Sequence, residues 1–268
     1  MGITLQDSLD DFIVYLQAQN IESLDTEQHI ALFAEYLLHY SDLFQEGWVD
    51  DEGELDEWEL NLHQQMEQLL QEEDGVDESL DLGNLPLDEI DVDHLSDFLG
   101  WFLLREPNMD SLQMGAAIET MQHWLQFVYQ QKWMDDVQYD ALFSTMSTLA
   151  PESIRVVKAA RLLFHFVRMG GCGSPRLRGE RFERFIEGHA RVVHIGDKSL
   201  QLAFDNSDDS LDEVMVPNEI LEFLQVGDVI DIELGLRGNS WTIVDIGPVY
   251  PRYIYMSAES VDMENKFI

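Results

Sequence analysis

The chain has 268 residues, and its 53 Asp and Glu against 15 Lys and Arg give a formal charge of −38. Hydrophobic residues make up 45% of it, which excludes a wholly disordered chain. The single cysteine excludes an internal disulfide, and no apolar run reaches the roughly 18 residues of a spanning helix. The first residues also lack the features of a secretory signal. We therefore expect a cytoplasmic protein with no membrane partner.

The charges are segregated along the chain. Residues 1–104 contain 28 Asp and Glu and no Lys or Arg. Residues 155–191 contain nine Lys and Arg against three Glu. The distribution predicts that the two kinds of charge occupy separate surfaces.

The first 169 residues predict an acidic all-α helical domain. Apolar residues recur at helical spacing from Leu5 to Leu16, from Thr26 to Leu37 and from Leu55 to Leu70. Asp93 has the character of an N-cap for a helix that continues through Leu103. Further helices are expected over 111–133, 137–149 and 151–169, and the Asp-, Glu- and Gly-rich stretch 71–85 predicts a loop.

The pattern changes at Gly170. Residues 170–186 form a basic hinge rich in Gly and Arg, with a short helix expected over 181–186. Strands are expected at 190–195, 199–204, 213–216, 229–234 and 241–246, with one or two helical turns at 217–224 and a hairpin turn at 237–240. Residues 187–250 therefore predict a small five-stranded OB-like or SH3-like β-barrel, followed by a tail over 251–268. The fold class is a two-part α+β protein.

Two dense acidic runs form the first candidate site. They are Asp50, Asp51, Glu52, Glu54, Asp56, Glu57 and Glu59, and Asp88, Glu89, Asp91 and Asp93. Duplex DNA carries one charge per roughly 1.7 Å of axis, and helices covered with carboxylates can imitate that density. These runs predict binding to a basic protein surface, such as that of a protein that handles nucleic acid. The alternative is a surface that only keeps the chain in solution.

A basic seam forms the second candidate site. On the helix 151–169 the residues Arg155, Lys158, Arg161, His165 and Arg168 share one face, and the seam continues through Arg176, Arg178, Arg181 and Arg184. Guanidinium groups bind phosphates through charge-assisted hydrogen bonds, so the seam predicts an anion site. The alternatives are that this face docks against the acidic helices of the same chain or is a solvated surface.

The sequence contains no catalytic signature, and it predicts neither a metal nor a cofactor. Cys172 has no identifiable His–Asp partner, and the glycine cluster lacks the Gly-Lys-Ser/Thr of a phosphate loop. The Glu–His pairs four residues apart lack the spacing of di-iron bundles. We therefore expect a non-enzymatic adaptor or inhibitor whose acidic helices bind a basic protein, with the barrel as a second contact. A nucleic-acid-binding protein that uses the basic seam and the barrel is the alternative, and a metal-dependent enzyme is the least favoured hypothesis.

Overall fold

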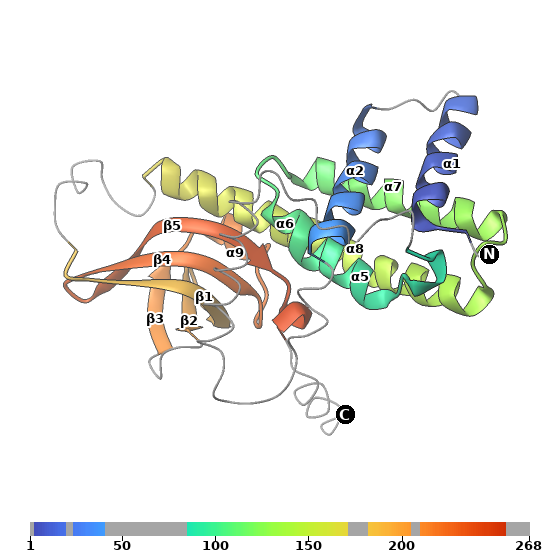
Figure 1. Ribbon diagram of the computed structural model, residues 1–268. Coiled ribbons are helices and arrows are strands. Elements are labelled where there is room, and N and C mark those ends of the chain that lie inside the picture. The colour runs from blue at the N-terminus through green and yellow to red at the C-terminus, as the bar shows by residue number, and fades with distance from the viewer. Residues whose placement is uncertain (1–2, 20–23, 41–84, 171–181, 205–209, 256–268) are drawn as a thin grey trace, which may run out of the picture. The chain divides into compact units, whose positions relative to one another are not determined.

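The computed structural model describes residues 3–19, 24–40, 85–170, 182–204 and 210–255 (Figure 1). Its helical elements are α1 (Leu5–Ala18), α2 (Leu24–His39), the 3-10 turn η1 (Leu87–Glu89), α5 (Val92–Asp97), the π-helical turn η2 (Phe98–Phe102), α6 (Leu103–Arg105), α7 (Ser111–Gln130), α8 (Asp136–Arg168), α9 (Asn218–Leu221) and the 3-10 turn η4 (Arg252–Tyr255). Its strands are β1 (Arg184–Ile195), β2 (Ser199–Phe204), β3 (Ser210–Met215), β4 (Val229–Arg237) and β5 (Ser240–Tyr250). Helices followed by an antiparallel sheet confirm the predicted two-part α+β class.

The chain forms two compact units. The helical unit comprises residues of Met1–His94 and His123–Tyr139, and the mixed unit comprises residues of Leu95–Gln122 and Asp140–Ile268. The mixed unit thus combines the sheet with most of α8. Several predictions lie outside the described residues: the helix over 55–70, the loop over 71–84, most of the hinge, and the tail from residue 256.

The helical unit has an aromatic core. Helix α1 begins where the hydroxyl of Thr4 accepts a hydrogen bond from the backbone N–H of Asp7 at 3.2 Å, and it buries Phe12 completely. The ring of Phe12 lies 5.5 Å from that of Phe127 on α7. On α2 the ring of Phe33 lies 5.5 Å from that of Trp124, and both side chains are fully buried. Aromatic pairs at such separations contribute beyond the area that they bury.

Helix α5 is capped by Asp91, so the prediction that Asp93 caps it was wrong. Oδ1 of Asp91 accepts hydrogen bonds from the backbone N–H groups of Asp93 at 3.0 Å and His94 at 3.1 Å. These bonds, with the His94 ring, lower the pKa of Asp91 although partial burial acts to raise it. The helix begins at Val92, two residues earlier than predicted.

The buried side chain of His29 on α2 should make the stability of the helical unit depend on pH. Its side chain is buried, and burial lowers its pKa even though Asp25 acts in the opposite direction. The pKa of His29 is therefore lower in the folded state than in the unfolded state. The contribution of the neutral side chain to stability is complete above the unfolded-state pKa, and it is lost as the pH falls through the folded-state pKa. We expect the unfolding temperature to fall as the pH drops below about 6.5, the ordinary pKa of a histidine. The His29→Gln variant should show a flatter profile in circular dichroism melts, whereas exchange of the exposed His123 for Gln should leave the profile as steep as in the wild type.

Helix α8 is one helix of 33 residues, where the sequence predicted two helices over 137–149 and 151–169. Pro151 lies inside it and removes one backbone donor, which costs about 3 kcal/mol in an isolated helix. Buried residues continue on both sides of the proline, from Met146 and Leu149 to Ser153 and Val156. Burial of one continuous face offsets the missing hydrogen bond, so the helix passes through Pro151 without a break.

The five strands form one antiparallel sheet in the order β3-β2-β1-β4-β5, and Figure 1 shows that the sheet curls strongly. On β2, Leu200, Leu202 and Phe204 are buried and alternate with half-buried residues, as expected for a strand with one covered face. The short helix predicted between the third and fourth strands is present as α9. The hairpin predicted at 237–240 is present as well, and Gly238 takes a positive φ of 58° there.

The short helix predicted over 181–186 was wrong, because β1 already begins at Arg184. Phe185 pairs with Gly235 and Ile186 with Leu234, so this segment extends the ladder with β4. The ring of Phe182 lies over Gly235, where an added Cβ would come within 2.6 Å of it. Cross-strand pairing therefore overrides the local helical pattern.

Candidate functional site

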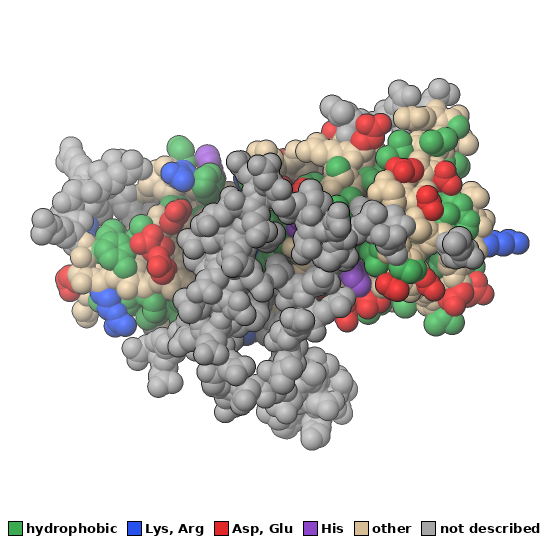
Figure 2. All heavy atoms as spheres, viewed as in Figure 1, with side chains coloured by type: hydrophobic (Ala, Val, Ile, Leu, Met, Phe, Trp, Pro, Cys, Tyr) green, Lys and Arg blue, Asp and Glu red, His purple; other side chains and the backbone are tan. Residues whose placement is uncertain are grey.

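The helical unit carries an almost uncompensated acidic surface. Its segments contain 29 Asp and Glu and a single cation, Lys132. The described acids of this unit are all exposed: Asp7, Asp10, Asp11, Asp25, Glu27, Glu35, Asp88, Glu89, Asp91, Asp93, Asp135 and Asp136. No Lys or Arg pairs with any of these described carboxylates, and Figure 2 shows Asp and Glu side chains spread over the part that carries α1 and α2. Carboxylates without local cations leave a negative potential that can attract a basic surface.

Of the two predicted acidic runs, the structure describes only the second. The run Asp50, Asp51, Glu52, Glu54, Asp56, Glu57 and Glu59 lies outside the described residues. In the second run, Asp91 serves as the cap of α5, and its Oδ1 lies 2.8 Å from Nδ1 of His94. Asp88 and Glu89 on η1 and Asp93 on α5 are exposed, and their carboxylates make no hydrogen bond with the described residues. These three side chains are therefore accessible to a partner.

Arg155, the first residue of the predicted basic seam, is held in an ion pair inside the mixed unit. Its Nη1 and Nη2 donate to the two carboxylate oxygens of Asp228 at 2.7 and 2.9 Å, and Nη2 also donates to Glu152 at 2.6 Å. Nη1 donates in addition to the carbonyl of Phe223 at 2.9 Å. Asp228 is fully buried and accepts a further bond from the backbone N–H of Gln225. The pair fastens α8 to the turn before β4.

The pKa of Arg155 reflects this arrangement. Burial acts to lower it, but the hydrogen bonds that the guanidinium donates to Asp228 and Glu152 outweigh burial and raise the pKa above its ordinary value. The guanidinium is thus always charged and already bound to carboxylates. It has few donors left for an external anion.

The other described cations of the seam differ in their surroundings. Nζ of Lys158 lies 4.1 Å from the centroid of the Phe223 ring, so this lysine also joins α8 to the segment before β4. The guanidinium of Arg168 lies 4.9 Å from the ring of Phe164 on its own helix. His165 and, at the start of β1, Arg184 are exposed. Arg176, Arg178 and Arg181 lie outside the described residues, and anion binding by the seam stays a prediction.

Arg161 is oriented by backbone carbonyls. Its Nε donates to the carbonyl of Met109 at 2.8 Å and its Nη2 to that of Pro107 at 2.6 Å. No Asp or Glu of the described residues forms an ion pair with it. Arg161 is therefore a half-buried cation held by dipoles alone.

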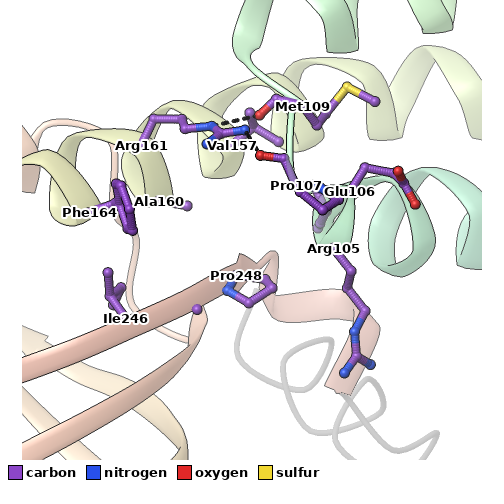
Figure 3. Close-up of a pocket in the computed structure, with 12 residues that line it drawn as sticks. Arg105, Glu106, Pro107, Met109, Val157, Ala160, Arg161, Phe164, Ile246 and Pro248 are labelled. Carbon is purple, nitrogen blue, oxygen red and sulfur yellow. Dashed lines mark hydrogen bonds between the residues drawn. The ribbon is translucent and has the colours of Figure 1, made fainter. Parts of the chain in front are cut away.

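A cavity of about 190 Å³ lies beside Arg161 within the mixed unit. Its walls come from the segment after η2, from α8 and from β5, and they are mostly apolar. Figure 3 shows Arg161 bonded to Pro107 and Met109 at one edge, with Phe164, Ile246 and Pro248 around the opening. No sequence pattern predicted this cavity, because its three wall segments are far apart in the chain.

Asp228 is the other site residue that the sequence did not indicate. It follows Gly227 directly before β4, and an acidic side chain in such a turn is ordinarily exposed. In the structure it is buried and paired with Arg155 of α8. A lone Asp after a glycine does not reveal such a partner.

The described residues contain no group of three or more His, Cys, Asp or Glu that could hold a metal ion. No helix in the described ranges has the length and apolar character needed to cross a membrane. Searches against protein-family models, curated proteins and solved structures found no match. The function must therefore be inferred from the geometry of the chain's own residues.

Proposed function

We propose that this protein is a non-enzymatic adaptor or inhibitor whose acidic helical unit binds a basic surface on another protein. The observation that carries this proposal is the exposure of every described acid of that unit, with one Lys in its whole sequence. A surface of one sign steers a partner of the opposite sign and fixes its orientation. A partner that normally binds nucleic acid fits best, because its cationic groove already accepts a dense row of negative charges.

The sheet is proposed as a second contact module of the OB-like kind. Support comes from the strand order β3-β2-β1-β4-β5, from the approach of β3 to β5, and from the position of α9 between β3 and β4. An OB-like barrel offers loops at one end and a strand face as binding surfaces. A cytoplasmic location stays a prediction that rests on the single cysteine.

The test compares two variants of equal net charge. In the first, Asp88→Asn, Glu89→Gln and Asp93→Asn neutralise exposed acids of the helical unit; Asp91 is kept because it caps α5. In the second, Glu187→Gln, Glu219→Gln and Glu222→Gln neutralise exposed acids of the mixed unit. Partners are first captured from nuclease-treated native extract on the immobilised full chain, eluted with salt, identified and purified.

We expect the first variant to weaken partner binding about tenfold and the second to change it less than about twofold, with unchanged unfolding temperatures. Exchange of Asp50, Asp51, Asp56 and Glu57 for their amides should weaken binding further, and added salt should imitate both effects. Duplex DNA should compete for the same partner if the surface imitates nucleic acid. Equal losses in the two variants, or binding insensitive to salt, would contradict the proposal.

A nucleic-acid-binding role through the seam and the barrel is the second candidate, favoured by the OB-like strand order alone. Single-stranded nucleic acid is usually bound by cations and stacking aromatic rings. Here Arg155 and Lys158 contact residues before β4, and Phe204 and Tyr250 are buried. Fluorescence polarisation with a labelled single-stranded oligonucleotide would support this candidate if the full chain binds and the Arg168→Ala and Arg184→Ala exchanges weaken binding. An unchanged signal at low salt would remove it.

A further inference from the structure

We propose that the cavity beside Arg161 is a binding site for a small organic carboxylate with a single-ring or similarly compact apolar body. This site lies within the mixed unit and is independent of the acidic surface. It would let the protein bind a small anion as well as a protein partner. Three features of the cavity carry the proposal: its charge, its lining and its size.

The charge comes from Arg161. Two of its donors are taken by the carbonyls of Met109 and Pro107, which fix the plane of the guanidinium at the cavity wall. No described carboxylate neutralises it, and the donors on Nη1 make no hydrogen bond within the described part of the chain. A guanidinium that is oriented but not neutralised is well suited to a carboxylate, because the charge-assisted bond requires little reorganisation of the arginine.

The lining selects an apolar body. Phe164 and Val157 from α8, Leu104 and Pro107 from the segment after η2, and Ile246 and Pro248 from β5 line the cavity. Such surface favours a ring or branched aliphatic group over a sugar or a free phosphate. The ligand would place its carboxylate at Arg161 and its hydrocarbon part against these side chains.

The size limits the ligand to one ring. The cavity measures about 190 Å³, and an engineered protein cavity of about 150 Å³ is known to accept benzene. A dinucleotide or a drug-sized molecule typically needs about 300–1,000 Å³. A benzoate-sized monocarboxylate therefore fits.

Two further charged residues line the cavity. Figure 3 shows the carboxylate of Glu106 directed away from Arg161. The Arg105 side chain also leads away from Arg161, and its guanidinium lies 4.6 Å from the ring of Trp101. Arg161 is thus the charged group that meets the ligand.

The experiment titrates the full chain with benzoate and, as its neutral match, with benzamide. Binding is followed by calorimetry and by NMR of the arginine side-chain Nε–H signals. A ligand of this size should bind with a dissociation constant of about 1 mM. We expect benzamide to bind about tenfold more weakly, because it lacks the charge that Arg161 recognises.

Three variants complete the test. Arg161→Met should weaken benzoate binding about tenfold, whereas Arg184→Met, an exposed arginine of the same unit, should change it less than about twofold. Because Arg161 also holds two carbonyls, Ala160→Leu serves as the second variant: it fills the cavity, leaves Arg161 in place and should abolish binding. The proposal is overturned if benzamide binds as well as benzoate, if Ala160→Leu binds like the wild type, or if benzoate leaves the spectra unchanged.

Discussion

Replacement of Arg155 by Met lowers the free energy of unfolding of the mixed unit by about 3–5 kcal/mol, because it leaves the Asp228 carboxylate buried without a cation. The side chain of Asp228 is 0% exposed and that of Arg155 13% exposed, so water cannot take the place of the lost guanidinium. The variant also removes the bonds to Glu152 and to the carbonyl of Phe223. Urea unfolding followed by circular dichroism measures the change.

A double variant separates the ion pair from the packing around it. Arg155→Met combined with Asp228→Leu removes both charges, so it should regain a large part of the stability that the single exchange loses. The matched control is Arg168→Met, since Arg168 is an exposed cation of the same helix that contacts the Phe164 ring; it should change stability by less than about 1 kcal/mol. A loss at Arg155 no larger than that at Arg168 would show that the buried pair does not hold α8 to the sheet.

Replacement of Trp124 by Ala lowers the stability of the helical unit by about 3–5 kcal/mol, because it empties the centre of the aromatic core. Trp124 is fully buried, and its ring lies 5.5 Å from that of Phe33. The neighbouring helices can close only part of the space left behind. Guanidinium unfolding at neutral pH measures this loss.

The Trp124→Phe variant tests whether shape or polarity dominates at this position. The indole Nε1–H of Trp124 is buried and has no hydrogen-bond partner in the described part of the chain. Phenylalanine keeps most of the volume and removes that donor, so the expected loss is only about 1–2 kcal/mol. Val14→Ala on α1 of the same unit, where the side chain is 61% exposed, should change stability by less than about 0.5 kcal/mol. Equal losses for Phe and Ala at position 124 would contradict this account.

The buried pair also bears on the choice between the two candidate functions. The sequence places Arg155, Lys158 and Arg161 on one basic face, and a face of this kind predicts an anion site. In the structure Arg155 binds Asp228, Lys158 covers the Phe223 ring, and Arg161 binds two carbonyls. These three cations thus contribute to the internal contacts of the mixed unit, which favours the acidic helical unit as the candidate for a partner surface.

The sequence by itself determined that helices precede a sheet of five strands, and it located the short helix α9 and the hairpin at Gly238. These features depend on local periodicity and turn chemistry, which act over a few residues. It also determined the segregation of charge, since composition is independent of the fold. The acidic run at Asp88 and Glu89 could be identified in the same way.

Only the tertiary structure decided which of these residues are exposed to a partner or ligand and which are used in internal packing. The continuity of α8 through Pro151, the extended conformation of residues 184–186 and the burial of Asp228 all depend on packing between segments far apart in the chain. The cavity beside Arg161 likewise needs three such segments. Long-range burial can outweigh a local preference of a few kcal/mol, and no pattern confined to neighbouring residues contains that information.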